Sequence, residues 1–245
     1  MAGVKDRLPM LFEIRSENRQ LLRKNFSDAE KDRQGKCAAS LIGDLRFFGV
    51  AEYVLHRDVV KFRSQLREAA EIREQVFKRI DDGEPIDKSY NSILGYNDVL
   101  NALASGDFET AESLAKRVSL TPVRPDVHEF DESFGRALCA VVLRESKAQS
   151  VVDSLQTRCN SKDKDFGGYA EFFSAILQKN AEAANKGLLN AIQGHKRQSE
   201  GKGVFANTED EALSVWAVAA ANLARHHGIR VFSPDEELVP NNHLI

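Results

Sequence analysis

The sequence contains little cysteine. Its three cysteines, Cys37, Cys139 and Cys159, are an odd number and lack CxxC spacing, so neither a disulfide framework nor a zinc site is indicated. Cys37 and Cys139 stand in apolar helical patterns, which predict buried thiols. Cys159 precedes Asn160 in a polar stretch that predicts a turn. A reactive thiol is therefore an alternative there, although no activating group stands nearby.

Long apolar segments are also missing. The longest run, residues 212–224, has eleven apolar residues out of thirteen. As a helix it would reach only about 20 Å at ~1.5 Å per residue, less than the thickness of a bilayer. Residues 1–17 contain no apolar stretch of the kind found in secretory signals. We therefore expect a cytoplasmic protein without a membrane partner.

Neither sign of charge is in large excess. The chain has 34 Lys and Arg against 37 Asp and Glu, a net charge of −3, so no strong field favours binding to nucleic acid. The basic residues of segment 57–79 are interleaved with Glu68, Glu71 and Glu74, unlike a continuous basic nucleic-acid face. No nucleic-acid partner is expected.

Sequence motifs that carry chemistry are absent as well. There is no GxGxxG, GxxxxGK[ST], GxSxG or HExxH. His226 and His227 are adjacent, so on a helix they would point about 100° apart and would not share a metal ion. We interpret them as cations near a helix C-terminus. The sequence thus predicts no catalytic residues, no cofactor and no metal, and indicates a protein that is not an enzyme.

What the sequence does contain is helix pattern, most clearly in residues 208–227. Thr208 and Glu211 have the spacing of a capping box, and Gly228 can adopt the left-handed conformation that ends a helix. The segment holds Trp216, the only tryptophan. Because a helix that is apolar almost all round must be surrounded by protein or lipid, we predict a buried central helix.

The segment before this helix repeats itself. Residues 95–118 match residues 168–191 at an offset of 73, with the polar breaks SGD and QKN aligned, and residues 134–155 read the same way round the break RESK. Each copy predicts two antiparallel helices joined by a tight turn. The irregular spacing differs from a regular tetratricopeptide array. Two polar linkers are predicted, at residues 121–133 and, as a mobile loop, at residues 195–207.

The N-terminal part predicts helices without this repeat. Residues 1–26 predict one short helix, and the spacing of Ser27 and Glu30 predicts a capping box that opens a helix ending near Phe48. Segment 50–80 has a heptad seam interrupted by Arg73, and we favour an amphipathic helix over a dimeric coiled coil. Strand content should be very low, with residues 229–232 as a short extended segment.

Together these patterns predict an all-α fold, with irregular antiparallel helical hairpins packed round a buried C-terminal helix. We expect roughly nine or ten helices in a single domain spanning residues 1–245. Residues 1–90 would supply the N-terminal helices, and residues 91–245 the hairpin repeats and the central helix.

Acidic residues recur between the predicted helices. Because charge complementarity speeds encounter and fixes register, we predict partner binding at two clusters, with solvated loops as the plain alternative. The candidates are Asp81, Asp82, Glu84 and Asp87 in the first cluster and Asp126, Glu129, Asp131 and Glu132 in the second.

The hairpin LASGDFETAESLA, the later YAEFFSAILQKN and LLNAIQGHKR, and the ending ALSVWAVAAANLARHHGIRVFSPDEELVP together resemble one family. This is the Imm49 family of bacterial immunity proteins, encoded beside polymorphic toxins. The resemblance covers residues 93–245. It implies a non-enzymatic inhibitor that neutralises one cognate toxin by tight binding, and it transfers no site residue. The alternative is a tetratricopeptide-like adaptor or regulator that binds a peptide or protein partner.

Overall fold

The structure, a computed structural model, describes residues 3–28 and 30–241, and within these ranges it contains ten α-helices and no strand. The all-α prediction is confirmed. The helices are α1 (Val4–Phe26), α2 (Lys36–His56), α3 (Val59–Asp81), α4 (Tyr96–Ser105), α5 (Phe108–Ser119), α6 (Glu129–Val142), α7 (Ala148–Ser161), α8 (Gly167–Leu177), α9 (Ala181–Gln198) and α10 (Val215–His226). Four short 3₁₀ turns accompany them: η1 (Lys88–Tyr90), η2 (Ile93–Gly95), η3 (Lys164–Phe166) and η4 (Glu209–Glu211).

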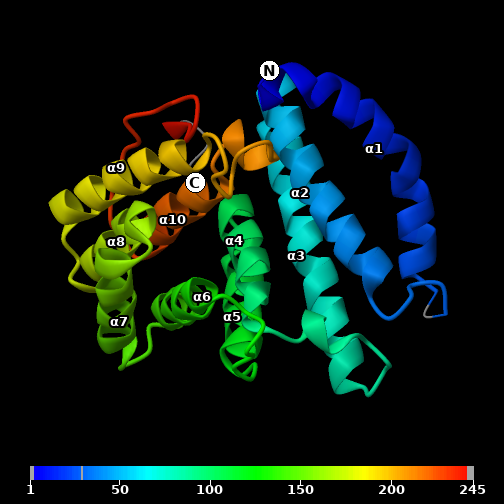
Figure 1. Ribbon diagram of the computed structural model, residues 1–245, viewed down its shortest axis with the longest axis horizontal. Coiled ribbons are helices and arrows are strands. Elements are labelled where there is room, and N and C mark those ends of the chain that lie inside the picture. The colour runs from blue at the N-terminus through cyan, green and yellow to red at the C-terminus, as the bar shows by residue number, and fades with distance from the viewer. Residues whose placement is uncertain (1–2, 29, 242–245) are drawn as a thin grey trace.

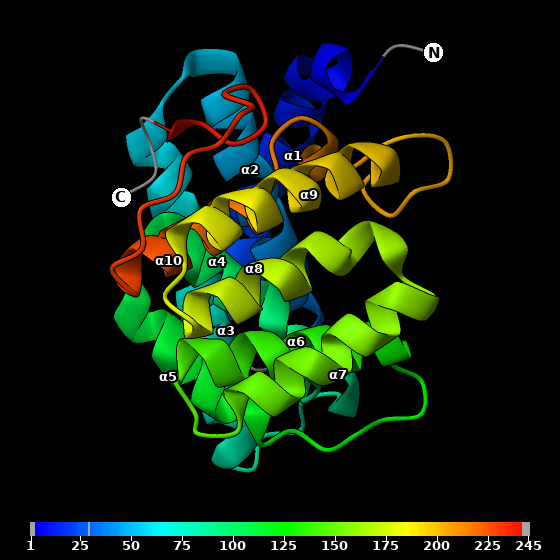
Figure 2. The same ribbon diagram turned by 90° about the vertical axis from the view of Figure 1, so that its left-hand side faces the viewer.

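Each helix from α1 to α9 packs against the next one in the chain (Figure 1). Helix α10 packs against α9 too, and it also returns to helices earlier in the chain, α4 and α8 (Figure 2). All its residues from Val215 to Ala224 are buried, and Trp216 is only 6% exposed. The predicted burial of this helix and its tryptophan is confirmed.

The three predicted hairpins are present as α4–α5, α6–α7 and α8–α9. Their turns share one geometry, in which a residue with positive φ is followed by an N–H that bonds to the carbonyl five residues back. The positive-φ residues are Gly106, Arg144 and Lys179, and the hydrogen bonds run from Asp107 to Ala102, Glu145 to Ala140 and Asn180 to Ala175, each at 3.0 Å. The aligned polar breaks therefore encode one repeated turn.

The predicted start of the central helix is wrong. Helix α10 begins at Val215, and its cap is Ser214, whose Oγ accepts a hydrogen bond from the N–H of Ala217 at 3.2 Å. The carboxylate of Glu211 instead accepts from the N–H groups of Asn207 (2.8 Å) and Val4 (3.0 Å). A tertiary contact has taken the side chain that a capping box would need. The predicted C-terminus is confirmed, since Gly228 has φ 77°.

Two N-terminal predictions also fail. The first helix was predicted to be short, but α1 has 23 residues. Ser27 ends α1, and α2 starts only at Lys36. The turn between them is held by buried Asp32, which accepts from the N–H of Ala38 at 2.9 Å and pairs with Arg79.

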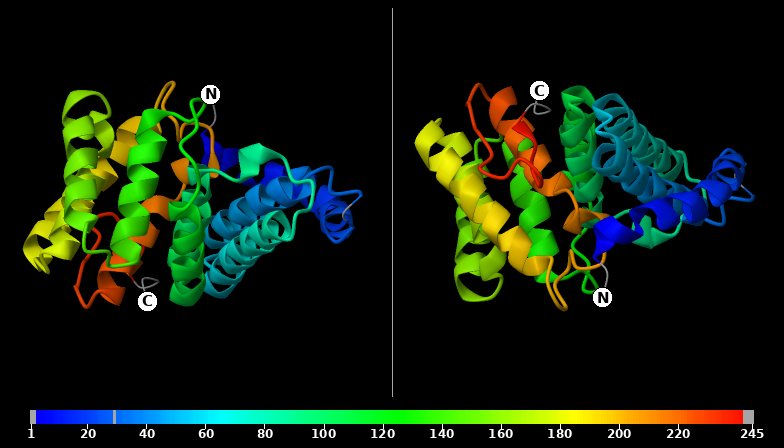
Figure 3. Two further views of the ribbon diagram at one scale, coloured as in Figure 1. Left: turned by 90° about the horizontal axis from the view of Figure 1, so that it is seen from below. Right: turned by 90° about the horizontal axis from the view of Figure 1, so that it is seen from above.

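The periodic segment 50–80 is not one helix. It is divided at Arg57, which has φ 56°, and Asp58 caps α3 by accepting from the N–H of Lys61 at 2.9 Å. Helices α2 and α3 pack side by side over their length (Figure 3). The apolar seam of α3 therefore faces neighbouring helices of the same chain, as we favoured over a coiled coil.

The two predicted linkers are shorter than expected. Residues 195–198 belong to α9, and His195 is buried. The mobile loop predicted at residues 195–207 therefore starts too early in the chain. The earlier linker ends at His128, which caps α6.

All three cysteines are buried. Burial raises the pKa of Cys139 and Cys159 to about 12, and Cys159 lies inside α7. A thiol with so high a pKa is almost fully protonated at neutral pH and hence a poor nucleophile. The alternative of a reactive Cys159 is wrong.

Across the described residues, no helix combines the length and the apolar character needed to cross a bilayer.

Candidate functional site

The first predicted acidic cluster is largely paired within the chain. Asp81 pairs with Arg117 at 2.9 Å, Asp82 with Lys78 at 2.5 Å, and Glu84 with Arg79 at 2.7 Å. Asp87 caps η1 by accepting from the N–H of Ser89 at 2.8 Å. The hydrogen bond from the Ser89 hydroxyl, followed by this backbone bond, lowers the pKa of Asp87. The charge that this cluster presents to a partner is therefore smaller than the sequence indicates.

In the second cluster only Asp126 lies in a loop. Glu129, Asp131 and Glu132 occupy the first turn of α6, where the helix dipole favours negative charge; their predicted place in a loop is wrong. The ion pairs are Asp126–Arg124 (2.7 Å), Glu129–Arg158 (2.5 Å) and Glu132–Arg136 (2.8 Å).

Asp131 lines a pocket bounded by several helices, whereas Asp81 lines a second, separate pocket between α3 and α5. The Oδ1 of Asp131 accepts a hydrogen bond from the hydroxyl of Tyr96 at 2.7 Å. Burial, followed by the charge of Asp131, raises the pKa of Tyr96 well above its usual value, so this phenol stays a donor at neutral pH. The other seven candidates do not line the pocket that Asp131 lines.

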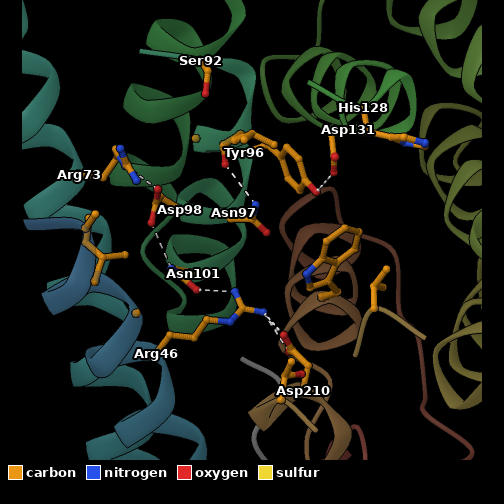
Figure 4. Close-up of a pocket in the computed structure, with 18 of the residues that line it drawn as sticks. Arg46, Arg73, Ser92, Tyr96, Asn97, Asp98, Asn101, His128, Asp131 and Asp210 are labelled. Atoms are coloured by element: carbon orange, nitrogen blue, oxygen red, sulfur yellow. Dashed lines mark hydrogen bonds and ion pairs between the residues drawn. The ribbon is translucent and has the colours of Figure 1, made fainter. Parts of the chain in front are cut away.

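The pocket has a volume of about 930 Å³ and lies where α2, α3, α4, α6 and the segment 204–216 meet (Figure 4). Volumes of this size suit a drug-sized ligand or a short segment of chain. Part of its wall is aromatic, formed by Tyr90, Tyr96, Phe130, Phe166, Phe205 and Trp216.

A chain of polar contacts crosses this pocket. Arg73 pairs with Asp98 at 2.6 Å, and the amide of Asn101 donates to Asp98 at 3.3 Å. The amide oxygen of Asn101 accepts from Arg46 at 3.0 Å, and Arg46 donates to both carboxylate oxygens of Asp210 at 2.9 and 2.6 Å (Figure 4). The contacts thus link α3, α4, α2 and η4 in one network. Arg73, which interrupts the heptad seam, has its partner here.

At the Arg46 end of the network, negative charges outnumber positive ones. Burial alone would lower the pKa of Arg46, but the carboxylates of Asp210 and Glu209 more than offset this and raise it. Burial, and then the charge of Asp210, raises the pKa of Glu209. The Glu209 carboxylate lies 3.6 Å from Nε of Arg46, and its side chain is 17% exposed. One arginine therefore serves two adjacent carboxylates.

A buried serine–histidine pair lies behind the pocket wall. Nε2 of His195 is 2.7 Å from the carbonyl oxygen of Asp210, so it must donate, and Nδ1 then accepts from the hydroxyl of Ser214 at 3.0 Å. Burial lowers the pKa of His195, which keeps the ring neutral. Ser214 has no exposed surface and caps α10. No substrate can reach its hydroxyl, so the pair positions the segment 210–214.

Sequence reasoning missed most of this pocket. Arg46, Asp98 and Asn101 were not candidates, and His195 was assigned to a mobile loop. A signal existed for His195, because it continues the apolar spacing of Ala184, Leu188, Ala191 and Ile192 along α9. The network itself has no such signal, since Arg46 and Asp210 are separated by 164 residues.

Within the described ranges, no group of three or more His, Cys, Asp or Glu residues is placed to hold a metal ion. Comparisons of the chain with models of known families, with curated proteins and with solved structures find no match. The pocket is therefore the candidate functional site.

Proposed function

We propose that this chain is an immunity protein that neutralises a cognate bacterial toxin by stoichiometric binding. The observation that supports a binding role is the pocket, which joins aromatic walls to a pre-formed polar network and an excess of carboxylates. Such a combination fits an anchor side chain from a basic protein, because interface hot spots fill desolvated pockets of this kind. The toxin as partner is the implication of the Imm49 resemblance.

An inhibitor that must silence a lethal enzyme at low copy number needs nanomolar or tighter affinity, about −12 kcal/mol. We place the complex in the cytosol, so the toxin would act on a cytosolic target such as nucleic acid, a nucleotide cofactor or a protein. A toxin that degrades the cell wall would contradict this location.

The direct experiment is co-expression with the product of the neighbouring gene, followed by co-purification and a viability assay. We expect a one-to-one complex and protection of the cells. If no neighbouring product binds, the immunity proposal fails.

The eight acidic residues predicted from the sequence remain a separate proposal for the docking surface. Asp82→Lys and Asp126→Lys each reverse one exposed charge, one in each cluster. We expect slower association and a changed salt dependence, with little effect on the melting temperature, because exposed ion pairs contribute only ~0–1 kcal/mol. Unchanged rates and affinity in both variants would eliminate docking by these clusters and leave the pocket as the site.

The second candidate is an adaptor that binds a peptide, and one observation favours it. Polar side chains of three successive helices, Arg46, Arg73 and Asn101, face a single concave site, as in helical peptide-binding grooves. An adaptor would bind an isolated peptide as tightly as the folded partner. An immunity protein would require the folded toxin and protect cells from it, so peptide and protein affinities measured side by side discriminate the two.

A further inference from the structure

The pocket is lined by more carboxylates than cations. Its two arginines, Arg46 and Arg73, are both paired within the network, and Arg158 pairs with Asp163 at 2.7 Å from outside the lining. These three cations balance only part of the acidic lining, which comprises Asp98, Asp131, Asp163, Glu209 and Asp210. A further cation would reduce this excess of negative charge.

Glu209 is the carboxylate with the weakest compensation in the network. Both Nη atoms of Arg46 are engaged elsewhere, Nη1 by Asn101 and Nη2 by Asp210. The ion pair of Glu209 with Nε is 3.6 Å long, longer than a charge-assisted hydrogen bond. Glu209 nevertheless lines the pocket, and its side chain is 17% exposed, so an incoming cation can reach it.

The aromatic wall favours a planar cation. The ring centroid of Trp216 lies 5.5 Å from that of Tyr96 and 5.5 Å from that of Phe205, and all three residues line the pocket. All three rings are at most 6% exposed, so a cation meets only a small part of their surface, where a guanidinium can lie against a ring while it pairs with a carboxylate. The ammonium group of lysine is not planar and does not stack on a ring in this way.

The size and rim of the pocket indicate that the cation enters on a polypeptide. A volume of about 930 Å³ exceeds what one guanidinium fills. Two apolar side chains at the lining, Leu94 and Val204, are 42% and 62% exposed. A polypeptide bound at the pocket would cover these exposed apolar side chains.

We infer that the pocket receives an arginine side chain of the partner protein, whose guanidinium pairs with Glu209 beside the rings of Tyr96 and Trp216. This inference rests on the proposed function only for the identity of the partner that carries the arginine.

The test uses the free protein and needs no toxin. N-acetyl-arginine amide is titrated at constant ionic strength, and N-acetyl-citrulline amide serves as the neutral isostere. The readout is the fluorescence of Trp216, the only tryptophan and a residue of the pocket wall. We expect a saturable change with the arginine compound and at least ~tenfold weaker binding of the citrulline compound, which corresponds to about 1.4 kcal/mol.

Two variants locate the site, each with a matched control. Glu209→Gln should weaken arginine binding ~tenfold, whereas Glu200→Gln, the same charge change at an exposed residue outside the pocket, should not. Asp131→Asn keeps an oxygen that can accept from Tyr96 and gives a second variant should Glu209→Gln unfold. Its control is Asp126→Asn, at an exposed residue outside the pocket.

The outcomes separate this inference from the proposed function. No saturable response, equal binding of citrulline, or equal loss in variants and controls would overturn the arginine site and leave immunity standing. Agmatine binding more than ~100-fold tighter than the blocked arginine would identify a free small cation as the ligand and overturn the partner arginine. Probe binding together with failure to capture any neighbouring gene product would reject only the toxin.

Discussion

Helix α1 buries only Val4 and Leu8 of its 23 residues, whereas α10 buries every residue from Val215 to Ala224. The two helices lie at opposite ends of the chain and are held by different interactions. Helix α10 is inserted among α4, α8 and α9, while α1 lies on the outside of α2 (Figure 1). Apolar packing therefore dominates the C-terminal part of the molecule.

Polar contacts from arginine compensate for the small apolar face of α1. Arg15 pairs with Asp44 at 3.3 Å, and Arg19 with Glu68 at 3.8 Å. The same two guanidinium groups lie over Phe47 and Phe48, with distances of 4.3 and 4.9 Å to the ring centroids. Partly exposed contacts of this kind are weak and depend on salt. The pocket lies where the two parts meet, and Arg46 of α2 bridges to Asp210 before α10.

The largest effect should come from the C-terminal core. Trp216→Ala should lower the free energy of unfolding by about 3–5 kcal/mol, the usual cost of removing a large buried aromatic side chain. Denaturant unfolding followed by circular dichroism measures it. Phe232→Ala, at a residue that is 53% exposed, should change stability much less. Equal effects of the two variants would contradict a core centred on α10.

The same glycine-to-alanine change should have opposite signs in the two parts. At Gly187 in α9 an added Cβ would lie 2.7 Å from the backbone nitrogen of Phe172, so α8 and α9 would have to separate. We expect a loss of about 1–3 kcal/mol from overpacking. At Gly43, an exposed position of α2, a Cβ meets nothing within 4 Å, and alanine should stabilise the helix by about 0.5–1 kcal/mol.

Thermal and denaturant unfolding of the two variants, each compared with the unchanged chain, shows whether each substitution raises or lowers stability. A destabilising Gly43→Ala would indicate that α2 packs more closely than the structure shows. A neutral Gly187→Ala would indicate that α8 and α9 can part without cost.

The sequence predicted what is encoded locally and missed what long-range contacts decide. The hairpins, the burial of Trp216 and the left-handed Gly228 follow from periodicity and turn chemistry, which involve neighbours in the chain. The capping box at Thr208 fails because Glu211 bonds instead to the N–H of Val4, 207 residues away. Spacing along the chain contains no information about such a competitor.

The candidate site shows the same division. Acidic residues could be found by inspection, but whether each has a partner could not: Asp81 meets Arg117 across two helices. Only Asp131 among the eight candidates lines the pocket. The burial of polar residues such as Asp98 and Asn101 could not be predicted from the sequence, because it depends on how α2, α3 and α4 pack together.

A pH-dependent effect is expected at the end of α10. Burial, with the nearby charges of Arg144 and His226, lowers the pKa of His227 from 6.5 to about 4. The unfolded chain therefore binds a proton between these pH values that the folded chain does not. Stability contributed by the neutral ring is complete above pH ~6.5 and is lost as the pH falls toward 4.

The free energy of unfolding, measured from pH 7 to pH 4, should fall less steeply in His227→Gln than in the unchanged chain. Carboxylates that titrate in the same range affect both proteins equally, so the difference isolates the histidine. Parallel curves would contradict the lowered pKa.

The smallest effect should be at α1. Glu68→Gln removes the charge that both Arg19 and Arg23 contact, and the side chains involved are 24–44% exposed. Solvent screening limits the expected loss to about 0.2–1 kcal/mol, and it should vanish at high salt. Because this charge anchors α1 to α3, amide hydrogen exchange should quicken in α1 while that of α10 stays unchanged. The matched control is Glu17→Gln, which removes an exposed charge on α1 itself. Faster exchange in α10 as well would mean that the two parts unfold together, and the contrast between a charge-anchored α1 and an apolar α10 would then not extend to their dynamics.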